Sequence, residues 1–513
     1  MTRALLLSLA LLALPTAAEG QRKRHFPADE DVALMLRYLV EDGAAPGAVL
    51  GVRDPDGSTR VVHYGISGPD SVQIGADAVF EIGSVTKTFT GTLLADMVLR
   101  GEVSLDDPVS RYLPDEVRMP SRNGRAITLL DLATHRSGLP TVPDNMRTPG
   151  RDAPDREYTV EDAYAFLSEY ELPREPGAER EYSNFGFGLL AHVLARAGEA
   201  SFRELIRERI LAPLGMVRTG FVESEGVPEG TVTGHRNAEP VRYRTPWEIM
   251  DGAGGLYSTA GDLLKYADAL VGSAETGVAR AVKLAAEVSV PTGEEGAGQG
   301  LGWGTSVYPG EQPVIGHGGG TTGFSARLLV MPATGTATVL LLNQHGFDDD
   351  IATSLLYFDP PPAEWDPVPV ARGILAGYAG TYERVDGSTS YYVRLEEDGW
   401  LTYQPPGAVR ARLYARSDSS FYLLRGPWSF AFARSGHGDV TLHMAVDERE
   451  PAHAGRVRLS ARRASSETPT PRVGARNAGF GAGWGPGTWA LIGIAGVVGL
   501  ALITAAIWRR RPR

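Results

Sequence analysis

A serine and a lysine three positions apart are the residues of this chain best suited to covalent chemistry. The only lysines are Lys23, Lys87, Lys265 and Lys283, and arginine supplies the rest of the 50 Lys and Arg residues. Lys87 follows Ser84 by three residues, a spacing that places two side chains on one face of a helix. A desolvated lysine can lose its proton near neutral pH, whereas an arginine cannot. The pair therefore predicts a serine nucleophile with a lysine base.

The local pattern predicts that Ser84 opens a helix. Apolar residues recur at helical spacing from Thr88 to Val98, and Arg100-Gly101 is a typical C-terminal stop. Backbone N–H groups are unpaired at a helix N-terminus, so they are available to an oxyanion beside Ser84. The simpler alternative is a helix-capping serine followed by a surface lysine, because S-x-x-K alone is a weak signal.

Two later stretches strengthen the catalytic interpretation. Tyr182-Ser183-Asn184 lies at a polar break before the apolar helical run Phe187–Leu194, and His317-Gly318-Gly319-Gly320 precedes a strand-like run. Alone, the first stretch is typical of a turn with a helix cap, and the second of a tight turn. Together with Ser84 and Lys87, in this order, they form a serine-hydrolase set.

The three motifs resemble the signature of the serine β-lactamase-like hydrolases of the class C type. Relatives of that family include D-alanyl-D-alanine carboxypeptidases, D-aminopeptidases and β-lactamase-fold esterases, and the signature is S-x-x-K, Y-x-N, then K-T-G or H-x-G. Three supporting stretches also match, Gly101–Val109, Leu132–Pro140 and Gly254–Asp262. The resemblance covers roughly Pro27 to Pro360. It implies an α/β (α+β) transpeptidase fold of the β-lactamase/penicillin-binding-protein type, with an antiparallel sheet flanked by helices, a helical lobe and the active site between them.

Four side chains have expected roles in the reaction. Ser84 is interpreted as the nucleophile that forms an acyl-enzyme, and Lys87 as its base, whose pKa must fall by burial. Tyr182 is expected to relay protons during attack or to protonate the leaving group; the alternative is a buried phenol with a satisfied hydroxyl. Asn184 is expected to bind a substrate amide and to neighbour Lys87, or else to cap the helix beginning near Phe185.

The third motif is expected to bind substrate through His317, Gly318 and Gly319, because glycines let a strand backbone approach a ligand closely. The resemblance implies that the oxyanion hole is formed by the N–H groups of Ser84 and Gly320. The β-lactamases proper carry a lysine where this chain has His317, and a histidine is mostly neutral at pH 7. This weakens carboxylate anchoring, so a β-lactamase is a minor alternative to the peptidase and esterase branches.

Two other residues are left outside the catalytic set. His135, in the stretch Leu132–Pro140, is interpreted as loop architecture. Trp303 is interpreted in the same way, with a place in the pocket wall as the alternative.

The two ends of the chain predict export and membrane anchoring. Residues 1–18 combine a basic residue, an apolar run and small residues, which is typical of a cleaved signal peptide; an uncleaved anchor is the alternative. Residues 489–508 carry no charge and precede the basic tail 509–513, which predicts a transmembrane helix with a cytoplasmic C-terminus. A cleaved C-terminal sorting signal is the alternative. The catalytic domain is therefore expected on the periplasmic or extracellular side of the membrane.

Between these ends the sequence changes character at a proline-rich break. The expected order is a hydrolase domain over 27–360, a linker over 361–370, a β-rich domain over 371–463 and a flexible tether over 464–488. Alternating strand patterns in the third part predict a small antiparallel barrel or curled sheet, which resembles the lipocalin-like extension of many family members. Packing against the hydrolase domain is favoured as its role over binding through its aromatic residues.

Composition excludes several function classes. The chain has no cysteine, so disulfides, thiol nucleophiles and cysteine-ligated metals are ruled out. Its ten histidines lack metal-ligand spacing, and its net charge of −12 offers no basic surface for nucleic acid. We therefore expect no cofactor and no metal, and a small ester or peptide, including cell-wall-derived ones, as substrate. The alternatives are an acylated sensor or penicillin-binding protein without efficient turnover, and an inactive scaffold.

Overall fold

The computed structural model describes residues 26–465 except for 69, 147–157, 223–225, 242–247, 293–296, 308–311, 347–350, 358–366, 385–388, 407, 425–427, 437–438 and 447–457. The expected signal peptide, transmembrane helix and basic tail lie outside these residues, as do most of the linker and nearly all of the tether. Among the described residues, no helix combines the length and apolar character that a membrane crossing requires.

An eight-stranded antiparallel sheet is the centre of the first structural unit. Its strands run in the order β2 (Thr59–Gly65), β1 (Gly47–Arg53), β14 (Thr336–Leu342), β13 (Ser325–Met331), β12 (Val314–Gly320), β11 (Gly304–Ser306), β10 (Gly298–Gln299) and β9 (Val290–Pro291). The first and last parts of this region thus pair in the middle of the sheet, where β1 runs beside β14. The antiparallel sheet expected from the sequence is confirmed.

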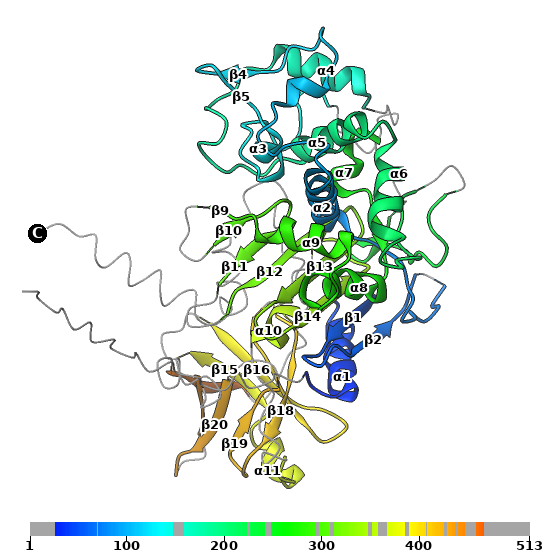
Figure 1. Ribbon diagram of the computed structural model, residues 1–513. Coiled ribbons are helices and arrows are strands. Elements are labelled where there is room, and N and C mark those ends of the chain that lie inside the picture. The colour runs from blue at the N-terminus through cyan, green and yellow to red at the C-terminus, as the bar shows by residue number, and fades with distance from the viewer. Residues whose placement is uncertain are drawn as a thin grey trace, which may run out of the picture.

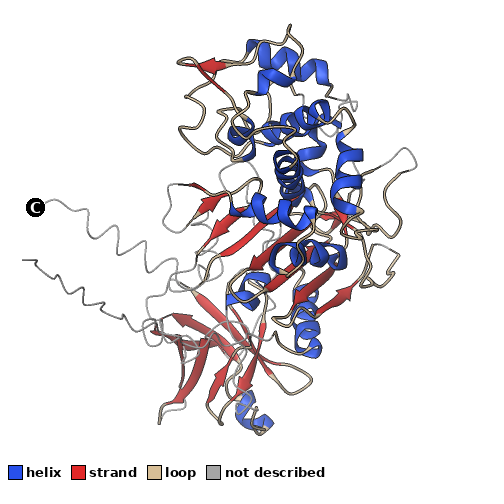
Figure 2. Cartoon of the chain, in the orientation of Figure 1, coloured by secondary structure: helices blue, strands red, loops and turns tan. Residues whose placement is uncertain are grey.

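Helices cover both faces of this sheet (Figure 1, Figure 2). Alternate residues of β1 point to opposite faces, so Val49 joins one apolar core while Ala48 and Leu50 join another. The first core includes α2 (Thr86–Leu99), α8 (Ala260–Val271) and α9 (Gly277–Glu287), and the second includes α1 (Asp29–Glu41) and α10 (Ile351–Tyr357).

A helical lobe lies beyond α2 on the side away from the sheet, at the top of Figure 1. It contains α3 (Leu129–Ala133), α4 (Val160–Glu169), α5 (Asn184–Ala197), α6 (Phe202–Ile206) and α7 (Asp251–Gly254). Three two-strand ribbons complete the unit, β3 (Phe80–Glu81) with β8 (Tyr257–Ser258), β4 (Ser121–Arg122) with β5 (Arg125–Ala126), and β6 (His235–Arg236) with β7 (Glu239–Pro240). Because α2 lies between lobe and sheet, nearly all of its side chains are buried.

The second unit is a closed barrel of eight antiparallel strands in chain order, preceded by α11 (Arg372–Ala376). The strands are β15 (Gly380–Arg384), β16 (Ser390–Leu395), β17 (Leu401–Gln404), β18 (Ala411–Ala415), β19 (Ser420–Tyr422), β20 (Trp428–Arg434), β21 (Val440–Val446) and β22 (Arg458–Ser465). The expected barrel is confirmed. Its buried core is rich in aromatic side chains, including Tyr382, Tyr391, Tyr403, Phe421, Phe430 and Phe432.

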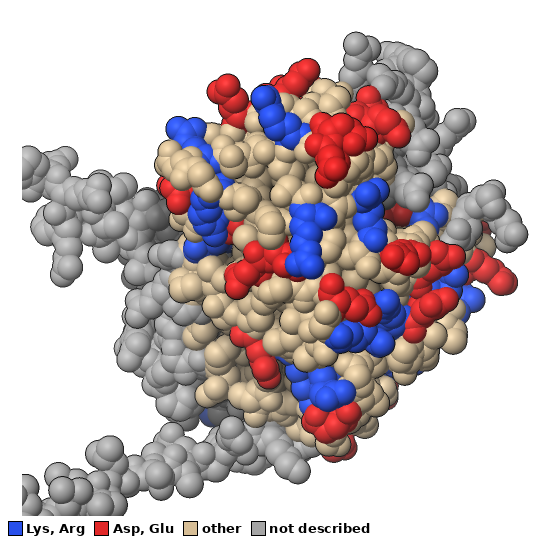
Figure 3. All heavy atoms as spheres, turned by 45° about the horizontal axis from the view of Figure 1, so that its top comes forward, with Lys and Arg blue, Asp and Glu red and all other residues tan. Residues whose placement is uncertain are grey.

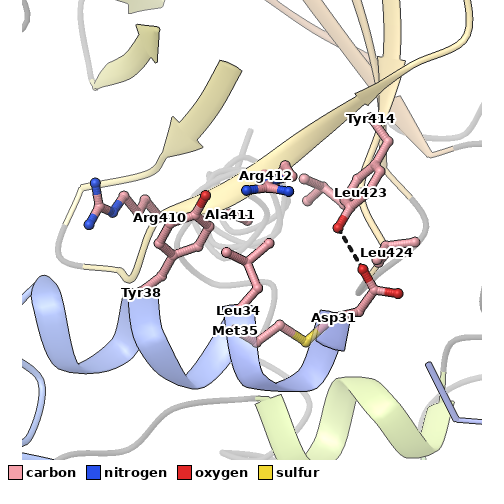
Figure 4. Close-up of a pocket in the computed structure, with 10 residues that line it drawn as sticks. All are labelled: Asp31, Leu34, Met35, Tyr38, Arg410, Ala411, Arg412, Tyr414, Leu423 and Leu424. Carbon is pink, nitrogen blue, oxygen red and sulfur yellow. Dashed lines mark hydrogen bonds between the residues drawn. The ribbon is translucent and has the colours of Figure 1, made fainter. Parts of the chain in front are cut away.

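The barrel contacts the first unit through α1 (Figure 4). Arg410, just before β18, lies over the Tyr38 ring at 4.7 Å and contacts Glu41 and Asp42 at the end of α1. Farther along, the Tyr414 hydroxyl donates to an Asp31 carboxylate oxygen at 3.0 Å. The sequence interpretation of the barrel as a packing module agrees with these contacts.

Charged side chains of both signs are interspersed over the face shown in Figure 3, without a large area of one sign. Some are paired within helices or turns, as Arg100 is with Asp96 and Arg111 with Asp107. In both pairs the arginine is exposed and the carboxylate is largely buried.

The buried pairing of Arg410 generates a stability prediction. The Asp42 side chain is only 4% exposed, so Arg410→Met would remove the cation paired with its buried carboxylate and leave only the weaker influence of Arg394. We expect a loss of about 3 kcal/mol or more in the free energy of unfolding, measured by urea denaturation. Arg37→Met is the matched control, because the Arg37 side chain is 50% exposed beside the same Glu41 and should cost less than about 1 kcal/mol. Equal losses in the two variants would contradict this account of the junction.

Candidate active site

Ser84 lies on a tight turn between β3 and α2. Gly83–Val85 form one turn of 3-10 helix, and α2 begins at Thr86 rather than at Ser84, which corrects the expected helix start by two residues. Gly83 has φ +49°, and a Cβ placed there would lie 2.8 Å from the backbone nitrogen of Gly320. The turn therefore requires glycine before the serine, and it leaves Ser84 partly exposed between buried neighbours.

Lys87 lies one turn along from Ser84, with its amine among three oxygen atoms. Its Nζ is 3.0 Å from Ser84 Oγ, 2.8 Å from Asn184 Oδ1 and 2.6 Å from the Ala253 carbonyl oxygen. The amide and carbonyl oxygens only accept hydrogen bonds. A neutral amine has two hydrogens for these acceptors and one lone pair, which is then directed at the Ser84 hydroxyl. This arrangement is the one a base for Ser84 requires.

Burial favours that neutral state. The Lys87 side chain is completely buried, and desolvation lowers its pKa well below the ordinary value of 10.5. Among the described residues no carboxylate pairs with its amine, and the ring centroids of Tyr182 and Phe187 lie 4.9 Å and 5.7 Å from it. The surface-lysine alternative for Lys87 is wrong, because no part of the side chain is exposed.

Tyr182 is the second side chain that contacts Ser84 Oγ. Its hydroxyl donates to Ser84 Oγ at 2.7 Å, and burial raises the pKa of the phenol above its ordinary value of 10.0. Tyr182 is therefore a neutral phenol near pH 7, able to give up a proton but not to act as a phenolate base. Ser84 Oγ lies between a proton acceptor, Lys87, and a proton donor, Tyr182.

Asn184 is brought to the site by the start of α5. Ser183 is the N-cap of this helix, and its hydroxyl accepts from the Gly186 backbone N–H at 2.8 Å. The alternative that Asn184 caps the helix is therefore wrong. Asn184 is the first helical residue, and its amide oxygen contacts Lys87.

The third motif forms the end of β12 rather than a tight turn. His317 Nδ1 lies 2.6 Å from the Gly318 carbonyl oxygen, which can only accept, so Nδ1 carries the hydrogen. Burial, followed by the charge of Lys87, lowers the pKa of His317 to about 3. The ring is neutral at pH 7, and its Nε2 is left as a hydrogen-bond acceptor. The centroid of the His317 ring is 6.3 Å from that of Tyr182.

The backbones of the Ser84 turn and of β12 touch each other. A Cβ at Gly319 would lie 1.9 Å from the Ile82 carbonyl oxygen and 3.1 Å from the backbone nitrogen of Ser84. Together with the Gly83 contact, this places the Ser84 and Gly320 nitrogens on two facing stretches of backbone. The oxyanion hole that the resemblance implies, with the Ser84 and Gly320 N–H groups as donors, stays a prediction.

Sequence reasoning underestimated His135 and missed Arg180. The His135 ring packs against Tyr182 with a centroid distance of 4.4 Å. Arg180 Nε donates to Gln299 Oε1 at 3.1 Å, and after the larger effect of burial its charge also acts on the pKa values of Tyr182 and His317. Trp303 is fully buried and stacks on Tyr266, so it belongs to the core and not to a pocket wall.

Comparison with known proteins gives a family for this arrangement. The Beta-lactamase family model matches residues 32–358, more than half of the chain. The chain belongs to the beta-lactamase family. Its relatives place it in the class C type of these serine hydrolases, as the motifs indicated.

Two curated members of the beta-lactamase family illustrate the similarity. The D-alanyl-D-alanine-carboxypeptidase/endopeptidase AmpH of Escherichia coli is 36% identical over 216 residues, which are 41% of this chain and 54% of that protein. A Beta-lactamase of Lysobacter lactamgenus is 29% identical over 267 residues, covering 51% of this chain and 66% of the relative. The chain thus spans about half to two thirds of these relatives.

Solved structures of the beta-lactamase family show the same fold. A class C beta-lactamase has a TM-score of 0.55 and 25% identity, covering 63% of this chain and 94% of that one. A Beta-Lactamase/D-Alanine Carboxypeptidase from Pseudomonas syringae has a TM-score of 0.54 and 22% identity, with coverage of 62% and 94%. The transpeptidase-type fold predicted from the sequence is confirmed.

The amine of Lys87 can be observed directly, because the chain has only four lysines. Since burial lowers its pKa, Lys87 should be neutral above that lowered value and an ammonium only below it. In lysine labelled with carbon-13 at Cε, we expect the Lys87 signal at the chemical shift of a neutral amine at pH 8. Lys87→Gln assigns the signal, and the exposed Lys265 provides a reference. An ammonium shift for Lys87 at pH 8 would contradict the assignment of this residue as the base.

Proposed function

We propose that this chain is a serine hydrolase that forms an acyl-enzyme on Ser84, with an ester or a D-amino-acid amide or peptide as substrate. The observation that carries the proposal is the position of Ser84 Oγ, 3.0 Å from Lys87 Nζ and 2.7 Å from the Tyr182 hydroxyl. A nucleophile with a base on one side and an acid on the other is equipped both to attack and to assist departure of the leaving group.

In the proposed acylation, Ser84 Oγ bonds to the carbonyl carbon while its proton passes to Lys87 Nζ. The N–H groups of Ser84 and Gly320 stabilise the resulting oxyanion. Tyr182 then donates its proton to the departing oxygen or nitrogen, and the bond to the leaving group breaks. The proton held by Lys87 returns to Tyr182, which restores both side chains.

Deacylation follows the same pattern with water as the nucleophile. Lys87 accepts a proton from the attacking water, and the water oxygen bonds to the acyl carbon. Tyr182 donates a proton to Ser84 Oγ as the acyl–oxygen bond breaks. The products are a carboxylic acid and the regenerated serine, and Lys87 again returns its proton to Tyr182.

The neutral His317 ring bears on the choice of substrate. It offers a lone pair and no permanent charge where a substrate carboxylate would be held, which favours esters and uncharged amides. Arg180 supplies a permanent positive charge near His317. Its partner Gln299 pairs across strands with Gly304, and Gly304 pairs with Gly316, the residue before His317. Together with the similarity to a D-alanyl-D-alanine-carboxypeptidase, this keeps a D-peptide within the proposed substrate class. A β-lactam is the minor alternative.

The proposal is tested by time-resolved intact mass spectrometry of the purified full chain mixed with a p-nitrophenyl ester. We expect a transient acyl adduct and steady nitrophenol release, with no adduct on Ser84→Ala. Lys87→Gln should slow adduct formation by about 10²–10⁴-fold, because it removes the base. Lys283→Gln is the matched control, since its ammonium pairs with Glu275 on the surface. An adduct that persists would favour the acylated sensor, and identical behaviour of wild type and Ser84→Ala would exclude Ser84 as nucleophile.

We further propose that the hydrolase faces outward and is tethered to the membrane. Support comes from the signal-like residues 1–18 and from the apolar segment 489–508 with its basic tail. The full chain should sediment with membranes after a high-salt wash, whereas a chain ending at residue 488 should be released to the exported soluble fraction. A full chain that washes off, or a mature protein from which 489–513 has been removed, would contradict the retained anchor.

A further inference from the structure

A loop from the helical lobe runs alongside the segment that carries Tyr182. The Thr141 hydroxyl donates to the Tyr182 carbonyl oxygen at 2.8 Å, and the Asn184 N–H donates to the Thr141 carbonyl oxygen at 3.1 Å. The Ser183 hydroxyl donates to the Pro140 carbonyl oxygen at 2.6 Å. These bonds hold the backbone that follows Tyr182. His135 holds the backbone both before and after Tyr182.

His135 holds the chain before and after Tyr182. The Glu181 N–H donates to the His135 carbonyl oxygen at 2.8 Å, and the Ser183 N–H donates to His135 Nδ1 at 3.1 Å. Between these two bonds, the imidazole packs against the phenol ring at a centroid distance of 4.4 Å and an interplanar angle of 33°. Backbone and ring of Tyr182 are thus held by one residue.

His135 has an unfavourable backbone conformation and an unpaired buried nitrogen, which the need to fill the core does not explain. Its φ is +60°, a region that most residues with a Cβ avoid, and its side chain is 1% exposed. Nδ1 accepts a hydrogen bond, so the neutral ring carries its hydrogen on Nε2, which has no hydrogen-bond partner among the described residues. An apolar residue would avoid the unpaired Nε2, but it would leave the buried Ser183 N–H without the acceptor that His135 supplies. Strain and an unpaired polar atom together point to a function.

The required state of the ring is maintained over the working pH range. Nδ1 can accept from Ser183 only while it is unprotonated. Burial, followed by the charges of Arg180 and Lys87, lowers the pKa of His135 well below its ordinary value of 6.5. The hydrogen bond therefore persists at pH 7 and above.

We propose that His135 is a positioning residue that holds the Tyr182 hydroxyl on Ser84 Oγ. The inference rests on the proposed function, because it assigns His135 a role only through the proton that Tyr182 donates. A phenol hydroxyl displaced by about 1 Å would lose much of its effect, since catalytic groups tolerate little misplacement. The proposal gives His135 no step in proton transfer, because the hydrogen bonds that its carbonyl oxygen and ring make among the described residues go to the backbone of Glu181 and Ser183.

The test is a double-mutant cycle on the rate of acylation, measured in the full chain with a D-amino-acid p-nitroanilide, whose amine leaving group must take up a proton as it departs. His135→Gly removes the ring and the acceptor while allowing the positive φ. His135→Asn tolerates the positive φ and places an amide oxygen where Nδ1 accepts. Each is made in the wild-type chain and in Tyr182→Phe, and thermal unfolding midpoints show that all variants are folded.

We expect Tyr182→Phe to slow acylation by about 10²-fold or more, as the loss of a proton donor does. In the wild-type chain, His135→Gly should slow acylation by at least about 10-fold, and the change should be in kcat rather than KM. In the Tyr182→Phe chain, His135→Gly should not slow acylation any further. His135→Asn should recover most of the rate. Equal losses from His135→Gly in both backgrounds, or failure of His135→Asn to rescue, would overturn the inference and leave a structural role.

The same cycle separates this inference from the proposed function. If Tyr182→Phe acylates as fast as wild type, the proton relay in the proposed function is wrong. If Tyr182→Phe is slow and His135→Gly is not, the relay stands and only the positioning role of His135 fails. If Ser84→Ala still acquires the adduct, both fail together.

Discussion

The structure of the site depends on the burial of one amine. Lys87 is completely enclosed, and its two acceptor partners, the Asn184 amide and the Ala253 carbonyl, leave a single lone pair for Ser84. A charged ammonium in this position would lose its hydration without gaining a carboxylate, which is a large cost. The neutral amine avoids that cost. Burial therefore disfavours the ammonium form and keeps Lys87 in the neutral form that can accept a proton.

The fold supplies the partners of this amine from separate parts of the chain. The Ser84 turn and Lys87 belong to β3 and α2, Asn184 begins α5, and the third motif ends β12. Glycines at the contacts let these backbones meet, as the Gly319 position against Ile82 shows. The barrel lies on the opposite side of the sheet, packed on α1, and none of its described residues contacts the site residues named above.

Sequence could predict what depends on residue type and spacing. The S-x-x-K pair, Tyr182 with Asn184, and the strand-like run after the His317 motif all follow from local pattern, and the structure has β13 (Ser325–Met331) at that run. What sequence could not predict depends on tertiary contact. His135 is one of ten histidines, and nothing in its neighbourhood reveals a positive φ or a ring packed on Tyr182. The sequence predicts α5 to begin near Phe185, with Asn184 as a possible cap; the helix begins one residue earlier and Ser183 caps it, because both residues have good capping side chains.

The most direct measurement is the pH dependence of the acylation burst, recorded by stopped flow with a p-nitrophenyl ester. If the neutral amine of Lys87 is the base, the burst rate must fall on acidification with a midpoint equal to that of the Lys87 signal in the carbon-13 spectrum, and far below pH 10.5. Above that midpoint the rate should stay level to the highest pH at which the protein is folded. A rate that rises only as the Tyr182 phenol ionises would contradict the account, because a phenolate would then be the base.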